Sequence, residues 1–455
     1  MDMECTDVLI DILRHLPPRG LAACRCVCKG WRATVDHHRL LRADLLPLSL
    51  DAVIWENDCI GPPTLFARRS TARYITSRLD YLEEDPEYGM YAGEIKDCCN
   101  GLLLIQNNKV VNPATRQWAQ FPQLPCECSP YGYCGRCCRN NRYLVYDPTI
   151  SPHYEVFFIP RIPCDVPDDM ASSMEWPPSQ YTMYVFSSKT ECWEERSFMR
   201  DGDAAGTIGD VKSLSNSDQN LYYPAYWQGS LYVPTRQRHG DFLLRINLSN
   251  EKYQVIELPK GALRSLYRLG KSEKGVYCVL YIDGRCAFQV WFLNESCGLI
   301  DWVLKNEINL EPLWRKYFSR HPDDGPWISQ SSDQDLLLLK NDVDLKLVDE
   351  YNEALAEDDF EWDSDDENVV STGDWPKKCS PNTQDYLSLD CLGFHPYKEI
   401  VLFREYHGAT VAYHLNSSKV RYLGELDPEM NLNHYGIEIS FAYTPCWTMD
   451  LPGSK

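Results

Sequence analysis

The chain has 455 residues, of which 44% are hydrophobic and 24% are charged, a composition typical of a globular protein with a large apolar core. Its formal net charge of −21 argues against nucleic acid or an anionic membrane as a partner, because both attract cationic surfaces. No run of apolar residues approaches the roughly 18–20 that a membrane-spanning helix needs.

The N-terminus carries Asp2, Glu4 and Asp7 and lacks the basic-then-apolar build of a signal peptide. We therefore expect the protein in the cytoplasm or the nucleus. In that reducing environment its 20 cysteines are expected to be thiols rather than a disulfide framework.

The first forty residues carry the most distinctive pattern. Apolar side chains recur at the i, i+3, i+4 and i+7 spacing that lines one face of a helix, at Leu9, Ile12, Leu13 and Leu16. Pro17 has no N–H to donate and is expected to end that helix.

A second helical run follows, in which Val27, Trp31 and Val35 recur every four residues. A module of about forty residues buries too little surface to be stable alone, so a partner is expected to cover part of the apolar face. The alternative from periodicity is an amphipathic helical hairpin packed on its own domain.

In order and spacing this stretch resembles the F-box, the helical module by which substrate receptors dock on the Skp-type adaptor of cullin-based ubiquitin ligases. The matching strings are Val8-Leu9, Ile12-Leu13, Leu16-Pro17, Leu21, Arg25-Cys26-Val27-Cys28-Lys29 and Trp31-Arg32. The family usually opens with a Leu-Pro pair, where this chain has Glu4-Cys5. The resemblance implies an F-box at residues 1–46 that binds the adaptor through Leu9, Ile12, Leu13, Leu16, Pro17, Leu21, Val27 and Trp31.

Residues 47–94 are predicted to be a linker that leads into a β domain. From about residue 95 the chain consists of short runs rich in Val, Ile, Leu, Tyr and Phe, separated by turn-forming residues, which is typical of antiparallel sheet. The segment 102–111 is predicted to be a hairpin with its turn at Asn107-Asn108. Gly229 is predicted to be the turn residue of another hairpin.

Similar units recur, in which a strand ends in a polar residue and a turn follows. They lie at Asn112, Asp147 and Asn247, with weaker copies at Asn294 and His414. The first two lie 35 residues apart, and Asn247 and Asn294 lie 47 apart. A period near forty with four strands to a unit predicts a β-propeller of about six blades. A pair of β-sandwiches is the alternative.

Two strings resemble the F-box-associated, kelch-like domain of plant F-box proteins. They are CNGLLL (99–104), followed by VVNPATRQW (110–118), and AYWQGSLYV (225–233). The resemblance implies a multidomain α+β protein, in which a small helical F-box precedes a mainly antiparallel all-β domain, a β-propeller, at residues 95–447.

Two segments depart from the strand pattern. Residues 349–367 contain eleven acidic and no basic residues, so about 349–372 is predicted to be a disordered insertion, either a solubilising loop or a site for a basic partner. Five thiols could hold a structural zinc or remain free, at Cys126, Cys128, Cys134, Cys137 and Cys138.

The sequence contains little that resembles a catalytic or cofactor-binding motif. Leu269-Gly270-Lys271-Ser272 looks like the end of a phosphate-binding loop, but Ser265 stands where the first glycine is required, so we predict a turn. The aromatic cluster Tyr222, Tyr223, Tyr226 and Trp227 is predicted to be either a recognition surface or core between blades.

The resemblance therefore implies a non-catalytic substrate-recognition subunit of an SCF (Skp-cullin-F-box) ubiquitin ligase, with no cofactor. It would bind the adaptor, through it a cullin, and an unknown target protein on the β domain. The alternatives are an F-box scaffold that acts outside a ligase, and a propeller that binds a ligand or sugar.

Overall fold

A computed structural model describes most of the β domain and part of the N-terminal helical region. The described residues are 3–16, 21, 24, 27–38, 40, 50–57, 63–68, 75, 79, 81–82, 94–124, 142–160, 166–212, 223–235, 242–260, 267–282, 286–296, 300–311, 325–330, 370–371, 389–405, 408–426, 437–447, 449 and 451–454. Pro17, the cysteine cluster at 126–138 and the acidic segment 349–367 lie outside them.

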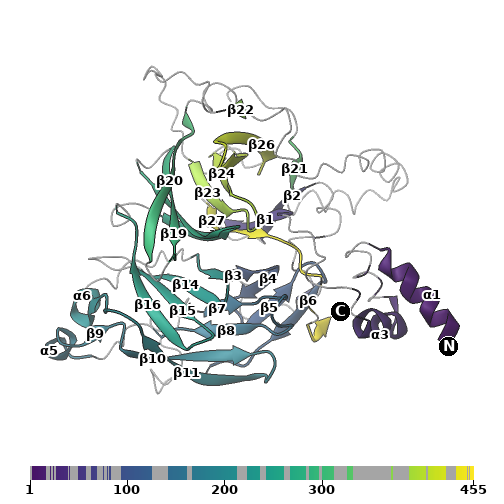
Figure 1. Cartoon of the computed structure of the whole chain (residues 1–455), viewed down its shortest axis with the longest axis horizontal. Helices are drawn as coiled ribbons and strands as arrows, with labels where there is room; N and C mark the ends of the chain where they lie inside the picture. Colours follow the sequence, from purple (N-terminus) through teal and green to yellow (C-terminus); the bar gives the residue numbers. More distant parts are fainter. Residues whose placement is uncertain are drawn as a thin grey trace.

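Two helices open the described chain, α1 (Met3–Arg14) and α3 (Lys29–His37), drawn in purple in Figure 1. Two further short helices, α5 (Asp168–Ala171) and α6 (Ile208–Lys212), belong to the β domain. Among the described helices, none has both the length and the apolar character needed to cross a membrane.

The described strands of the β domain form six antiparallel units of four consecutive sheet neighbours, which we number 1 to 6. Unit 1 is β3 (Ile95–Cys99), β4 (Leu102–Ile105), β5 (Lys109–Asn112) and β6 (Gln117–Gln120). Unit 2 is β7 (Arg142–Val145), β8 (Glu155–Phe158), β10 (Gln180–Ser187) and β11 (Cys192–Arg200). Unit 3 is β13 (Ala225–Trp227), β14 (Ser230–Thr235), β15 (Phe242–Asn247) and β16 (Lys252–Glu257).

Units 4 and 5 continue the same pattern. Unit 4 is β17 (Tyr267–Ser272), β18 (Gly275–Tyr281), β19 (Ala287–Asn294) and β20 (Asp301–Asn309). Unit 5 is β23 (Leu389–Phe394), β24 (Ile400–Glu405), β25 (Ala409–His414) and β26 (Lys419–Glu425). Unit 6 is β27 (Ile437–Tyr443), β1 (Ala52–Asn57), β2 (Thr64–Arg68) and β21 (Trp327–Gln330). Short strands β9 (Glu175–Trp176), β12 (Gly206–Thr207), β22 (Val370–Ser371) and β28 (Gly453–Ser454) add to the sheets or pair with each other.

The units follow one another around the β domain, as Figure 1 shows. First strands contact each other between units, in the pairs β3 with β7, β13 with β17, β17 with β23, β23 with β27, and β27 with β3. The described core is correspondingly divided into one cluster for each pair of successive units: Leu104 with Val156, Phe198 with Leu244, Leu243 with Leu280, Phe288 with Phe403, Leu402 with Phe66, and Tyr443 with Leu103. Six units joined by six cores make a ring.

The ring closes through unit 6, which combines distant parts of the chain. β27 pairs antiparallel with β1, in a register that places Phe441 opposite Ile54. On the far side of this sheet β2 pairs with β21. The range 47–94, expected as a linker, therefore contributes two strands to the ring. Their short apolar runs were too weak a pattern to show that their partners lie at the other end of the chain.

The predicted all-β domain after the helical module is confirmed, and the predicted hairpin at 102–111 has Leu103 opposite Val111. The repeat at Asp147 needs correction. Asn112, Asn247, Asn294 and His414 each end the third strand of a unit, whereas Asp147 follows the first strand of unit 2. Ser187 ends the third strand of that unit instead.

Asp97 is a buried carboxyl group that joins units 1 and 2. It accepts hydrogen bonds from the backbone N–H groups of Leu144 and Cys98, both at 2.7 Å. Burial nevertheless raises the pKa of Asp97 from 3.8 to about 7, because desolvation penalises the charged form more than the two N–H donors favour it.

This pKa makes a prediction for Asp97→Asn. Because the folded pKa lies above the unfolded one, Asp97 stabilises the fold below pH 4, and that contribution is lost as pH rises to about 7. The wild type should lose a few kcal/mol of unfolding free energy relative to the variant over that interval. Urea unfolding of both proteins from pH 4 to pH 8 measures the difference. A difference independent of pH would contradict the raised pKa.

Candidate functional site

The N-terminal helices enclose a small apolar core of their own. Its buried members come from α1, α3 and the residues between and after them: Ile10, Leu13, Leu21, Val35 and Leu40. Four further side chains pack against this cluster while staying partly exposed: Leu9, Leu16, Cys24 and Trp31. Burial raises the pKa of the Cys24 thiol, which favours its neutral form.

The predicted adaptor-binding residues divide into three groups. Leu13 is 0% exposed and Leu21 is 2% exposed, so both serve the internal core. Leu9, Leu16 and Trp31 lie at its border. Ile12 and Val27 point away from it and are 58% and 64% exposed. Pro17 lies outside the described residues.

Val8 joins the exposed group, although the predicted site did not include it. Its side chain is 60% exposed and lies four residues before Ile12, so the two share one face of α1. The i, i+4 spacing of Val8 and Ile12 was the signal that could have identified it. We call Val8, Ile12 and Val27 the exposed apolar set. Exposed apolar side chains gathered on so small a module are typical of an interaction surface.

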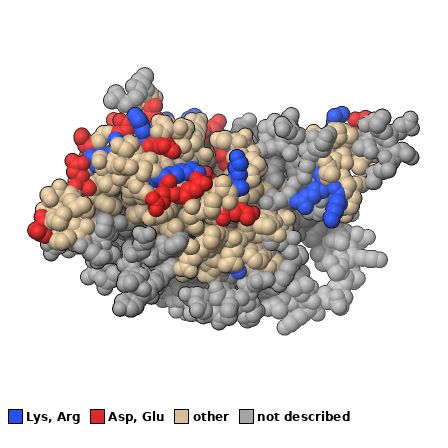
Figure 2. Space-filling model, turned by 90° about the horizontal axis from the view of Figure 1, so that it is seen from below, with Lys and Arg blue, Asp and Glu red and all other residues tan. Residues whose placement is uncertain are grey.

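Basic side chains are also exposed on the two helices. Arg14, Lys29 and Arg32 are exposed, and Figure 2 shows blue side chains on the helical module at the right. Arg14 lies 3.3 Å from Asp11, but both side chains are more than half exposed, so this ion pair adds little stability. The module therefore carries both exposed apolar and exposed basic side chains, in a chain whose net charge is −21.

A protein-family model described as the F-box domain matches residues 5–43, the stretch that contains both helices and the exposed apolar set. Residues 5–43 are an F-box domain. The F-box predicted from the residue strings at 8–32 is thereby confirmed, and its first matched residue is Cys5. The core of this F-box includes Leu13 and Leu21, whereas Val8, Ile12 and Val27 are exposed apolar side chains on its surface.

Two Arabidopsis thaliana proteins named as F-box proteins resemble the chain over far more than the F-box. At5g52610 is 24% identical over 317 residues, which cover 66% of this chain and 76% of the relative. At5g07610 is 22% identical over 335 residues, which cover 68% of this chain and 71% of the relative. The chain is therefore similar to plant F-box proteins through much of its β domain as well.

Two solved structures resemble the chain only weakly. A family 117 glycoside hydrolase from Zobellia galactanivorans aligns with 58% of this chain and 72% of its own, at 8% identity and a TM-score of 0.22. A prolyl endopeptidase structure aligns with 94% of this chain and 55% of its own, at 9% identity and a TM-score of 0.26. At these TM-scores neither likeness bears on the fold or the activity.

In the described part of the chain, no three His, Cys, Asp or Glu side chains gather where they could hold a metal ion. The zinc prediction for Cys126–Cys138 concerns residues beyond that part. Of the aromatic cluster, Trp227 packs beside Tyr232 in the core between units 3 and 4, whereas Tyr223 and Tyr226 line a pocket considered below.

Proposed function

We propose that this protein is a substrate-recognition subunit of an SCF ubiquitin ligase that works in the cytoplasm or the nucleus. Its F-box docks on a Skp-type adaptor, which links it to a cullin, and its ring of six units acts as a β-propeller that binds a target protein. The chain itself performs no bond chemistry. Holding the target beside the ubiquitin-conjugating enzyme raises the local concentration of its lysines.

The exposed apolar set is the observation that carries this proposal. Val8, Ile12 and Val27 are each more than half exposed, whereas the apolar side chains of the neighbouring core are buried. Burying an apolar side chain that is fully exposed contributes roughly 1.5–3 kcal/mol. A partner that covers all three side chains therefore gains a large part of the binding free energy that corresponds to a micromolar Kd. An F-box supplies the identity of that partner, a Skp-type adaptor.

The division between core and surface decides which variants can test the docking. Substituting Leu13 or Leu21 would damage the core of the module. Ile12→Asp combined with Val27→Asp places charges only on the exposed surface and should leave that core intact. Arg14→Ala is a matched control, because Arg14 is exposed on the same helix but lies two residues, or about 200°, around it from Ile12.

Co-expression with a Skp-type adaptor and purification through a tag on the adaptor give the measurement. We expect the wild type and Arg14→Ala to co-purify with the adaptor in a 1:1 complex. The amount of the double variant recovered with the adaptor should fall at least tenfold, because desolvating a charge against an apolar partner is costly. Circular dichroism checks that the double variant is folded. Equal recovery of all three proteins would contradict docking through the exposed apolar set.

A further inference from the structure

A small pocket lies where the first strands of the units converge. Its volume is about 90 Å³, room for a few water molecules or one small chemical group. Its walls come from five of the six first strands or the residues beside them, β3, β13, β17, β23 and β27. Because first strands meet only at the middle of the ring, this is a pocket of the central channel, and we call it the channel pocket.

Two cations line the channel pocket, both from β17. Arg268 is only 6% exposed, and its guanidinium lies 3.6 Å from the ring centre of Tyr223. Its Nη atoms donate to the carbonyl oxygens of Cys391 and Ser440 and to the hydroxyl of Ser440. These contacts fix the guanidinium plane while leaving its Nε–H without an acceptor among the described residues.

Lys271 lies three residues further along the same strand. Its ammonium group donates to Oδ1 of Asn100 at 2.7 Å, and an ammonium can donate three hydrogen bonds. Asn100 comes from the turn after β3, so this contact bridges units 1 and 4 across the channel. The sequence pattern around Lys271 was predicted to be a turn, but residues 267–272 form β17, and the turn follows at Glu273 and Lys274.

Among the described residues, neither of these two cations forms an ion pair with an Asp or Glu. Asp390 interacts electrostatically with Arg268, but its ion pair is with Arg404 at 4.0 Å. The carboxyl group of Asp97 already accepts hydrogen bonds from two backbone N–H groups, and its raised pKa leaves it partly protonated near neutral pH. No Asp or Glu is among the described residues that line the pocket. Two positive charges in a partly dry site, with no ion-paired carboxylate among the described residues, are unusual in a protein with a net charge of −21.

We propose that the channel pocket binds an oxyanion, a carboxylate or a phosphate group, that a target protein presents to the ring. Arg268 and Lys271 would supply the charge and the free N–H donors, and Tyr226 and Phe394 the apolar walls. The volume fits the anionic group alone, so the rest of the target would lie outside. That a target protein carries the group rests on the proposed function; binding of the anion itself does not.

Thermal unfolding of the full-length chain with added anions tests the proposal. Inorganic phosphate and glutarate are titrated against sodium chloride at equal ionic strength, so that only specific binding raises Tm. We expect a saturable rise in Tm with at least one of the two probes. A preference for phosphate would point to a phosphorylated target, and a preference for glutarate to an acidic side chain.

Variants at Lys271 assign that rise to the channel pocket. Lys271→Met removes one charge and should raise the half-saturating concentration at least tenfold, as expected for a hydrogen bond to a charged group. Lys271→Arg keeps the charge and should leave the half-saturating concentration within a few-fold of the wild-type value. Lys274→Met is the matched control, because Lys274 is exposed in the following turn and carries the same charge, and it should change the value less than twofold.

Two results would overturn the proposal. One is a wild type in which neither probe raises Tm beyond the chloride control. The other is a Lys271→Met variant that binds as tightly as Lys274→Met. Adaptor co-purification is independent of these residues, so loss of anion binding with intact docking would refute the channel pocket alone, and the reverse result would refute the ligase proposal alone.

Discussion

Replacing Gly101 by alanine is expected to lower the free energy of unfolding by about 2–5 kcal/mol, the sum of a left-handed backbone penalty and an overpacking cost. Gly101 has φ +85° in the turn between β3 and β4. A Cβ atom there would lie 2.4 Å from the carbonyl oxygen of Thr444 and 2.7 Å from the backbone nitrogen of Cys446. The clash is with backbone just after β27, so relief requires moving the segment that follows the closing strand of the ring.

Gly229→Ala separates the two costs. Gly229 occupies the same turn position in unit 3, with φ +73°, but nothing lies within 4 Å of its added Cβ. The free energy of unfolding of Gly229→Ala should therefore fall only by the left-handed backbone penalty, about 1–2 kcal/mol. Urea unfolding followed by tryptophan fluorescence gives both values. Equal losses for the two alanine variants would mean that Gly101 does not abut the C-terminal segment.

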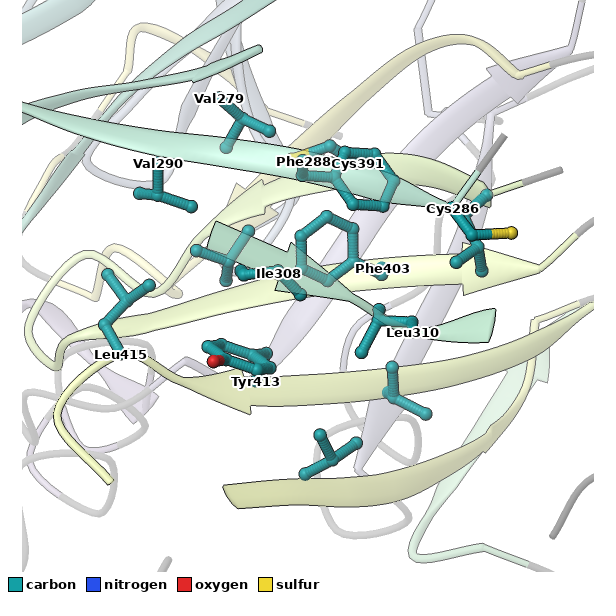
Figure 3. Packing of buried hydrophobic residues seen from close by; sticks show 14 of the residues in the cluster. Val279, Cys286, Phe288, Val290, Ile308, Leu310, Cys391, Phe403, Tyr413 and Leu415 are labelled. Carbon is teal, nitrogen blue, oxygen red and sulfur yellow. The ribbon is translucent and has the colours of Figure 1, made fainter. Parts of the chain in front are cut away.

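Replacing Phe288 by alanine is expected to cost about 3–5 kcal/mol, the range for removing a buried phenylalanine ring. Phe288 is 1% exposed, and its ring centre lies 4.6 Å from that of Phe403 in unit 5 and 5.1 Å from that of Tyr281. Figure 3 shows Phe288 and Phe403 facing each other, with Cys391 beside them. The substitution would therefore open a cavity between units 4 and 5.

Phe292→Ala provides the control on the same strand. Phe292 is only partly buried, packs on Tyr277 with ring centres 5.0 Å apart, and carries Lys305 above its ring. Its loss should cost less than half as much, because water already reaches part of the ring. If both variants unfolded at the same urea concentration, the packing between units 4 and 5 would not be the tight interface described above.

Helical periodicity predicted the amphipathic helices, and the order of the residue strings gave their resemblance to the F-box, but neither separates core residues from surface residues. Ile12 and Leu13 are neighbours in one apolar stripe, yet Leu13 is buried and Ile12 is 58% exposed. A helix that packs on its own module with one side and on a partner with the other is apolar on both, so periodicity cannot separate them. Only the position of α3 and of Leu21 decides which side chains turn inward.

Units 1 to 5 were predictable in outline because each is formed by strands that follow one another along the chain. Hairpins such as β4–β5 are set by neighbouring residues and a turn, here Asn108 with φ +57°. Ring closure is different, because β1 pairs with β27 nearly four hundred residues away and no local pattern records that. The same holds for Arg268, whose burial depends on carbonyl groups from β23 and β27 that meet β17 only in the folded ring.

The strings at Asp147 and Ser187 illustrate how a repeat can mislead. Both mark a strand end followed by a turn, and the side chain of each accepts a hydrogen bond from the backbone N–H two residues on. That chemistry belongs to turns in general and does not say which of the four strands has ended. The interval from Asn112 to Asp147 therefore compared two different positions in the units.

Assembly of the full-length chain with a Skp-type adaptor and a cullin, measured by native mass spectrometry, tests the central proposal most directly. The account predicts one complex with a single copy of each protein, which disappears when Ile12→Asp and Val27→Asp are combined and persists with Arg14→Ala. A chain that binds the adaptor but never the cullin would contradict the ligase proposal and favour an F-box scaffold that acts outside a ligase.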